Sequence, residues 1–308
     1  MIVEDAIKAF KKSPRNSFTI FLFHGVVKKF NNKNTVTNYN NKNIHLKKFK
    51  FFLKRISNIG DPISMDDVYK IIKKKQKISN RSFAITFDDG FENNIKIAAP
   101  LLINFKIPFT IYITTKFVDE NEMSWADKMD YAVDKTKSKN LRIEELKKDF
   151  NLQTRKSKIL FLDIIRNFVK KNKNIDPYKF ASKICKKLKV QKFPRKNIIY
   201  KKADWGQLKK ISRNKLCIIG GHSHTHRILS YMNNKDLINE ISKSIKMIKK
   251  NLSYDLKHYS YPEGFKESFS KKIINLLKKK SIKCCPTAIS GINNTNSNLF
   301  LLKRVSVT

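Results

Sequence analysis

Two adjacent carboxylates at the end of an apolar run are the first residues in this sequence suited to chemistry. Residues 83–87 are apolar or β-branched, and Asp88, Asp89 and Gly90 follow them directly. Neighbouring carboxylates repel each other, so a nearby cation is needed to keep both ionised. A structural role is the alternative, because aspartate is also common in the turn and N-cap before a helix. The pair alone does not separate these interpretations.

Histidines form the second cluster. Three of the chain's six histidines, His222, His224 and His226, lie within five residues directly after the apolar run 216–219. In a helical turn His222 and His226 share a face and His224 points away, whereas in an extended loop all three align. Either geometry supplies two imidazoles to one metal ion, so the clustering favours metal binding over isolated structural histidines.

The two clusters together supply the parts of a hydrolytic metal site. Two imidazoles and one carboxylate leave coordination positions open for water and substrate. A divalent metal lowers the pKa of bound water from about 15.7 to about 7, and a free carboxylate can then accept its proton. We therefore expect Asp89 to be a ligand with His222 and His226, and Asp88 to be the base. Zinc is the default ion, and Co²⁺, Ni²⁺ or Mn²⁺ fits the same ligands.

The elements around these clusters predict an α/β protein with a mostly parallel sheet, either a barrel or an open wound sheet. Such sheets place functional groups where their strands end. Short apolar runs predict strands at 18–23, 83–87, 109–113, 216–219, 258–261 and 284–289. Amphipathic patterns predict helices at 92–105, 235–252 and 267–280. Residues from about 120 to 203 are rich in helix formers and lysine, with no convincing strand, and they read as a helical insertion in one domain spanning 1–308.

The formal net charge of +41 invites comparison with proteins that bind acidic polymers. Only 10 of the 66 basic residues are arginine, and the lysines are spread along the whole chain. Nucleic-acid sites favour arginine and concentrate their charge, so we expect no specific nucleic-acid partner. Peripheral attraction to an anionic membrane surface stays open. The N-terminus has no apolar signal-like core, and no run approaches 18 apolar residues, so a cytoplasmic location is expected. The oligomeric state is not indicated.

The motifs Thr86-Phe87-Asp88-Asp89-Gly90 and His222-Ser223-x-x-His226 resemble the two defining motifs of the polysaccharide deacetylases. That family is carbohydrate esterase family 4, the NodB-homology domain. Weaker similarity runs through Trp125-Ala126-Asp127 and Asp204-Trp205, which resemble its bacterial surface-polysaccharide branch.

The resemblance implies a distorted (β/α)7 barrel with the helical insertion. It also implies a divalent metal held by Asp89, His222 and His226, with Asp88 as catalytic base.

Two departures from the family pattern concern the base and the proton donor. The third motif corresponds to Ser260-Tyr261-Pro262-Glu263-Gly264, without the arginine that orients the base. The resemblance still implies an oxyanion or substrate role near Glu263 and Ser260. The histidine of the fifth motif has no counterpart, because no histidine follows His258. His24 and His258 are the candidates for the general acid, and each is also a plausible structural histidine.

The function expected from these residues is hydrolysis of an N-acetyl group on an amino sugar, a carbon–nitrogen bond other than a peptide bond. The expected substrate is a saccharide or polysaccharide precursor. A formamide or ureide on the same scaffold is an alternative substrate. A catalytically weak saccharide-binding protein is another alternative, although a pure binding protein has no need of a base.

Overall fold

A central parallel sheet organises the protein in the computed structural model, which describes residues 1–30 and 35–308. The strands are β1 (Phe18–Phe23), β5 (Ser82–Phe87), β6 (Phe109–Ile113), β9 (Cys217–Gly221) and β10 (Arg304–Ser306). They are hydrogen-bonded in the order β10-β1-β5-β6-β9, and every pair is parallel. The short β4 (Asp61–Pro62) pairs with the start of β5. The α/β class predicted from the sequence is confirmed.

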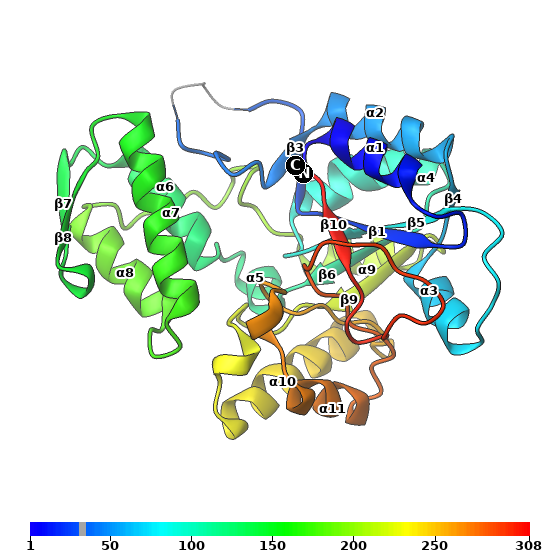
Figure 1. The fold of residues 1–308 in the computed structure, drawn as a ribbon. Coiled ribbons are helices and arrows are strands. Elements are labelled where there is room, and N and C mark those ends of the chain that lie inside the picture. The colour runs from blue at the N-terminus through cyan, green and yellow to red at the C-terminus, as the bar shows by residue number, and fades with distance from the viewer. Residues whose placement is uncertain (31–34) are drawn as a thin grey trace.

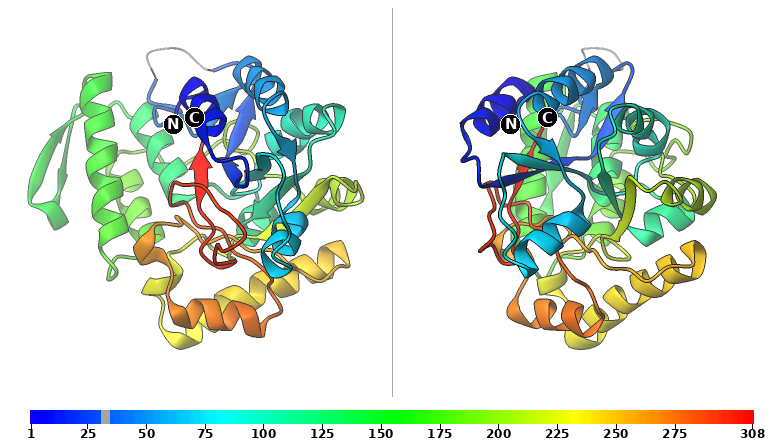
Figure 2. Two further views of the ribbon diagram at one scale, coloured as in Figure 1. Left: turned by 45° about the vertical axis from the view of Figure 1, so that its right-hand side comes forward. Right: turned by 90° about the vertical axis from the view of Figure 1, so that its right-hand side faces the viewer.

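The wall between β9 and β10 is completed by isolated bridges instead of full strands. Parallel bridges join Gly221 to Tyr259, His258 to Cys284, and Pro286 to Leu302, which directly precedes β10. These contacts close a ring of seven chain segments, which is the distorted (β/α)7 barrel (Figures 1 and 2). The strands predicted at 258–261 and 284–289 are therefore present only as isolated bridges, two in each segment. A separate parallel pair, β2 (Gly25–Val27) with β3 (Asn43–His45), follows β1.

Amphipathic helices cover the outside of the sheet. They are α1 (Val3–Lys12), α2 (Leu46–Ser57), α3 (Met65–Lys73), α4 (Ala99–Asn104), α5 (Thr115–Glu120), α9 (Trp205–Ser212), α10 (Asn234–Leu252) and α11 (Lys271–Lys279). Edge-to-face phenylalanines join α1 and α2 to the sheet, with Phe10 5.6 Å and Phe52 4.9 Å from Phe21 between ring centroids. Among the described residues, no helix is long and apolar enough to cross a membrane.

The helix predicted at 92–105 is divided into two parts. A π-helical turn, η1 (Asn94–Ala98), precedes α4, which has a proline, Pro100, in its first turn. Proline has no backbone N–H and cannot bond the carbonyl four residues earlier, so regular α-helical bonding is interrupted there. The predicted helices at 235–252 and 267–280 correspond to α10 and α11, the latter after a short 3-10 turn, η4 (Lys266–Ser268).

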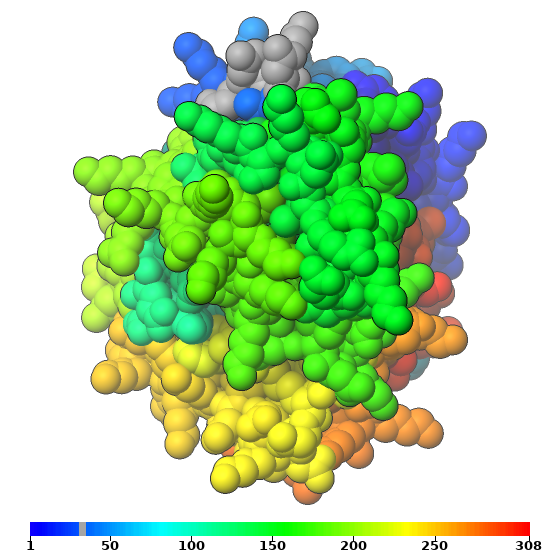
Figure 3. Space-filling view, turned by 90° about the vertical axis from the view of Figure 1, so that its left-hand side faces the viewer, coloured from blue at the N-terminus to red at the C-terminus, as the bar shows by residue number. Residues whose placement is uncertain are grey.

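The segment from about 120 to 203 projects from one side of the barrel (Figure 1). It contains α6 (Trp125–Lys135), α7 (Arg155–Lys171), α8 (Pro177–Lys187) and a hydrophobic core of its own around Met129, Phe161 and Ile184. From its own side, this segment forms much of the visible surface above α10 (Figure 3).

The sequence prediction of no strand in this segment was wrong. A hairpin of β7 (Asn140–Ile143) and β8 (Lys148–Asn151) joins α6 to α7. Only Leu141, Ile143 and Phe150 of these strands are buried, so the alternation is too short to stand out among charged neighbours.

Candidate active site

The aspartate motif forms a tight turn at the end of β5. Asp88 continues the strand, and its N–H donates to the carbonyl of Phe23. Asp89 and Gly90 then take positive φ values of 75° and 71°. Aspartate tolerates this left-handed conformation better than most residues, and glycine adopts it freely. Because of this turn, Asp88 and Asp89 both line one cavity rather than pointing to opposite faces of a strand.

The histidine motif follows β9 in a coiled loop. Ser223 and His226 have positive φ, and the His226 N–H donates to Ser223 Oγ. Glu240 on α10 fixes the loop from outside by accepting the N–H groups of His224 and Thr225. His224 turns away, and its ring lies 2.9 Å from Thr115 Oγ1. His222 and His226 come together while His224 points away, as expected for a helical turn, but the backbone forms an irregular bend with left-handed residues and not a helix.

Asp89, His222 and His226 come together, with one potential ligand atom from each lying within 4.8 Å of the others. Asp89 Oδ1 is 3.2 Å from His226 Nε2 and 3.7 Å from His222 Nε2. His222 Nδ1 lies 2.9 Å from the Ser260 carbonyl, so it carries the proton and Nε2 is free as a ligand atom.

Two further features of these residues fit a divalent cation. Asp89 Oδ1 is buried and has no hydrogen-bond donor among the described residues. Burial alone would raise the pKa of Asp89, but Lys42 and His226 hold it well below its usual value. The carboxyl is therefore ionised at neutral pH. A carboxylate with one oxygen left unbonded, facing two imidazole nitrogens, suits an ion such as Zn²⁺.

Asp88 is held by an arginine that the motifs do not contain. Arg304, on β10, donates from Nη1 and Nη2 to the two carboxylate oxygens of Asp88, each at 2.8 Å. Its Nη2 also donates to Ser260 Oγ, and its Nε to the Thr287 carbonyl. Burial alone would raise the pKa of Asp88, but Arg304 and His222 lower it below its usual value. The missing third-motif arginine is thus replaced in space by Arg304.

A second group of charges surrounds Asp89 from the insertion side. Lys42 Nζ lies 2.7 Å from Asp89 Oδ2 and 3.3 Å from Asp127 Oδ1. Lys202 is fully buried, 3.7 Å from Asp127, with its Nζ 3.3 Å from the centre of the Phe91 ring. Burial lowers the pKa of Lys202 to about 8. Asp127 is therefore the shared partner of two cations, and one of them, Lys42, also binds the second oxygen of Asp89.

The two candidate proton donors lie in different places. His24 lines the same cavity as Asp88 and Asp89, and burial lowers its pKa to about 4, so it is neutral at pH 7. His258 does not line this cavity. Its ring nitrogens contact Cys284 and Asp66, each at 2.9 Å, and Asp66 lies in the first turn of α3. His258 is thus engaged in a structural contact.

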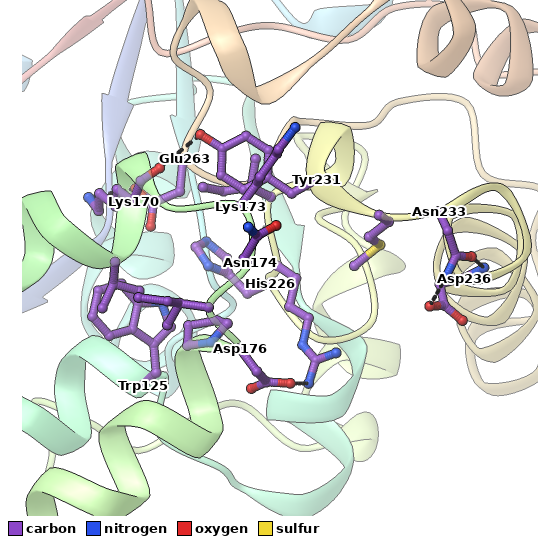
Figure 4. A pocket seen from close by; sticks show the side chains of 16 residues that line it. Trp125, Lys170, Lys173, Asn174, Asp176, His226, Tyr231, Asn233, Asp236 and Glu263 are labelled. Atoms are coloured by element: carbon purple, nitrogen blue, oxygen red, sulfur yellow. Dashed lines mark hydrogen bonds and ion pairs between the residues drawn. The ribbon is translucent and has the colours of Figure 1, made fainter. Parts of the chain in front are cut away.

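Of the two residues expected to have an oxyanion or substrate role, Glu263 lines the cavity and Ser260 does not. Ser260 is fully buried and contacts the site indirectly, through Arg304 and His222. Glu263 lines the cavity directly, and its carboxylate is 2.6 Å from Lys170 Nζ on α7. The cavity has a volume of about 260 Å³ and also includes Trp125 and Arg166 from the insertion. The candidate site residues from the barrel therefore share a cavity with side chains of the insertion (Figure 4).

Comparisons with known proteins agree with this arrangement. Residues 168–285 match the family model described as polysaccharide deacetylase. That segment includes the histidine motif and residues 260–264 but not the aspartate motif. A search of curated protein sequences gave no match.

Solved structures match nearly the whole chain. The Streptococcus pyogenes deacetylase PplD, solved with acetate, has a TM-score of 0.61 at 12% identity, covering 95% of this chain and 93% of that one. IcaB from Ammonifex degensii has a TM-score of 0.58 at 14% identity, covering 95% and 92%. A de-N-acetylase from Aggregatibacter actinomycetemcomitans has a TM-score of 0.58 at 13% identity, covering 94% of each chain. At these identities the structures show a shared fold.

The site and barrel define the class as an α/β protein of the NodB-homology fold. The family-model match over residues 168–285 and the fold shared with solved deacetylases support the resemblance to the polysaccharide deacetylases that the two motifs indicate.

Sequence reasoning did not find Arg304, Lys42 or Lys170. A usable signal existed for Arg304, which is one of only 10 arginines and lies, with Lys303 and Ser306, among the apolar residues of the segment 301–307. Lys42 and Lys170 gave no such signal, because lysine occurs throughout the chain.

Proposed function

We propose that this protein removes the acetyl group from an N-acetylated amino sugar by metal-dependent hydrolysis. The observation that carries the proposal is the position of Asp88, which lies beside the cluster of Asp89, His222 and His226 in one cavity. A protein that only binds a saccharide has no need of a buried, ionised carboxylate beside three potential metal ligands. The family match supports a saccharide substrate.

Each side chain has a role in this proposal. Asp89, His222 and His226 would hold the divalent ion, which supplies Lewis acidity and a water of lowered pKa. Asp88 accepts a proton from the attacking water, since a carboxylate oxygen that accepts one hydrogen bond from Arg304 still has a free lone pair. Glu263 and Trp125 lie across the cavity, where they contact the sugar.

Of the two histidines considered as proton donors to the leaving amine, only His24 lines this cavity. His258 is outside it, and neutral His24 keeps one ring N–H but carries no extra proton at pH 7. His24 is therefore the histidine placed to contact the leaving group. The water that gives its proton to Asp88 offers a second route, because Asp88 can pass that proton to the amine.

Acetate release from N-acetylated oligosaccharides by the Zn²⁺-loaded protein tests the proposal. Asp88→Asn should lower kcat by about 10²–10⁴-fold, the usual effect of removing a general base. Asp255→Asn is the matched control, because the Asp255 side chain is 79% exposed and lies outside the cavity. A protein that binds zinc stoichiometrically but deacetylates no amino sugar would contradict the proposal. Equal activity in Asp88→Asn would remove Asp88 as the base.

A further inference from the structure

A cysteine, a histidine and an aspartate form a series of contacts outside the candidate active site. Cys284 Sγ lies 2.9 Å from His258 Nδ1, and His258 Nε2 lies 2.9 Å from Asp66 Oδ1. None of the three lines the cavity of the aspartate and histidine motifs, and the proposed hydrolysis does not use them. A nucleophile, a base and a group that orients the base, each within hydrogen-bond reach of the next, form the arrangement that activates thiols in enzymes.

The barrel wall fixes the thiol and the imidazole side by side. A parallel bridge joins His258 to Cys284, and directly before it the Lys283 N–H donates to the Lys257 carbonyl at 2.7 Å. The carboxylate comes from a different element, since Asp66 lies in the first turn of α3. Asp66 and His258 are 192 positions apart, so only the folded barrel brings the three side chains together.

The charges in this series of contacts favour a proton on His258. Its hydrogen bond with Asp66 lowers the pKa of that carboxyl below the usual value, so Asp66 is ionised at neutral pH. Burial alone would lower the pKa of His258, but Cys284 and Asp66 raise it to about 9. A protonated imidazole donates from both ring nitrogens, so Cys284 Sγ accepts the hydrogen bond from Nδ1. A neighbouring imidazolium stabilises a thiolate.

The other three cysteines, Cys185, Cys217 and Cys285, lack this environment. All four thiols are free and buried. Burial raises the pKa of the other three thiols, as is usual for inert cysteines in a hydrophobic core. Within the described part of the chain, only His258 has a ring nitrogen at hydrogen-bond distance from a cysteine sulfur. Cys284 is therefore distinguished by its partner and not by its exposure.

We propose that His258 holds Cys284 as a thiolate, and that Cys284 is the cysteine of this protein that hydroperoxides oxidise. The sulfur attacks one peroxide oxygen, and an S–O bond forms as the O–O bond breaks. Sulfur is oxidised and the peroxide is reduced. The leaving oxygen takes the proton of His258, so hydrogen peroxide yields a cysteine sulfenic acid and water. This modification site is independent of the deacetylase activity.

Access to the sulfur is on the side of α3. The Asp66 side chain is 41% exposed, whereas that of His258 is buried, so protons exchange with water through Asp66. The peroxide reaches the buried sulfur through local opening of the structure. Cys285 is the next residue and is equally buried, so its oxidation rate is the reference for access without activation.

Peroxide labelling of the native protein tests the proposal. After treatment with hydrogen peroxide, dimedone traps the sulfenic acid, and mass spectrometry quantifies each labelled cysteine. Cys284 should be labelled at least about tenfold faster than Cys285, because the thiolate and not the thiol is the nucleophile. His258→Gln should bring the two rates close together. Equal labelling of Cys284 and Cys285 in the wild type overturns the proposal.

Two variants in the first turn of α3 separate activation from general damage to the structure. Asp66→Asn removes the anion that stabilises the protonated ring, so labelling of Cys284 should slow by at least about threefold. Asp67→Asn makes the same change of charge at the next residue, but Asp67 contacts Ser64 and not His258. It should therefore keep the wild-type rate. Slowing of equal size in both variants overturns the role of Asp66.

Ultraviolet absorption detects the thiolate without a reagent, and therefore without any need for access. Thiolates absorb in the far ultraviolet more strongly than thiols do. At neutral pH, Cys284→Ser should lose absorbance relative to the wild type, whereas Cys285→Ser should not. Identical spectra for the two variants overturn the thiolate. Loss of absorbance in Cys284→Ser together with equal labelling of Cys284 and Cys285 overturns the oxidation site alone.

Discussion

The Arg304–Asp88 contact allows the sharpest test of how this site is held together. Both side chains are almost fully buried, at 1% and 3% exposure, and two hydrogen bonds of 2.8 Å join them. Arg304→Met leaves the Asp88 carboxylate without its main cation. Removing one partner of a buried ion pair costs about 3–5 kcal/mol, because the other charge stays buried without compensation. Global stabilities of about 5–15 kcal/mol make such a loss measurable.

A double-mutant cycle distinguishes a specific pair from general damage to the core. We expect Arg304→Met and Asp88→Asn each to destabilise the protein, and the double variant to lose about 2–3 kcal/mol less than the sum. The assay is urea unfolding at pH 7 of chelator-treated protein, with the slopes compared to detect changes in the unfolded state.

A surface pair provides the control cycle. Arg142 and Asp149 are at a similar distance, 2.7 Å, but their side chains are 52% and 70% exposed. Exposed pairs are worth at most about 1 kcal/mol, since water screens both charges. A coupling energy for Arg304 and Asp88 no larger than that of the surface pair would refute the assignment of Arg304 as the partner of Asp88.

Two further predictions concern metal binding and pH. At about 100 times its Kd, Zn²⁺ should raise the free energy of unfolding by about 2.7 kcal/mol, which a thermal-shift assay can follow. Asp89→Asn should lose most of this gain. An equal shift in the variant and the wild type would exclude Asp89 as a ligand. Burial alone would lower the pKa of His258, but Cys284 and Asp66 raise it to about 9. The stabilisation from the protonated ring is therefore complete below its unfolded pKa of about 6.5 and is lost as the pH rises through 9. His258→Gln should accordingly be less stable than wild type in urea at pH 6, with a smaller difference at pH 10, whereas a constant difference would contradict the charged contact.

The residues brought together at the site were predictable where local chain geometry decides their position. A strand that ends in polar residues places them at the edge of a parallel sheet, and both motifs follow such strands, β5 and β9. The coiling of the histidine loop was not predictable in this way. It depends on Glu240, which comes from the middle of α10 and accepts two backbone N–H groups.

The partners of the aspartates were beyond sequence reasoning because they come from distant parts of the chain. Arg304 lies 216 positions from Asp88, and Lys42 reaches Asp89 from the other side of the site. In a chain with 66 basic residues, the pattern of lysines does not indicate which one becomes buried. The same limit applies to the barrel wall at Tyr259 and Cys284, where isolated bridges depend on tertiary contacts and not on strand propensity.

The two adjacent aspartates lie in different environments because different cations hold them. Arg304 occupies both oxygens of Asp88, which disfavours Asp88 as a metal ligand while leaving it ionised. Lys42 occupies only Oδ2 of Asp89, so Oδ1 remains unbonded and faces His222 and His226. Exchanging the two cations would exchange the environments of the two carboxylates. The proposed division between base and ligand therefore follows from the positions of Arg304 and Lys42, and not from the order of the two aspartates in the motif.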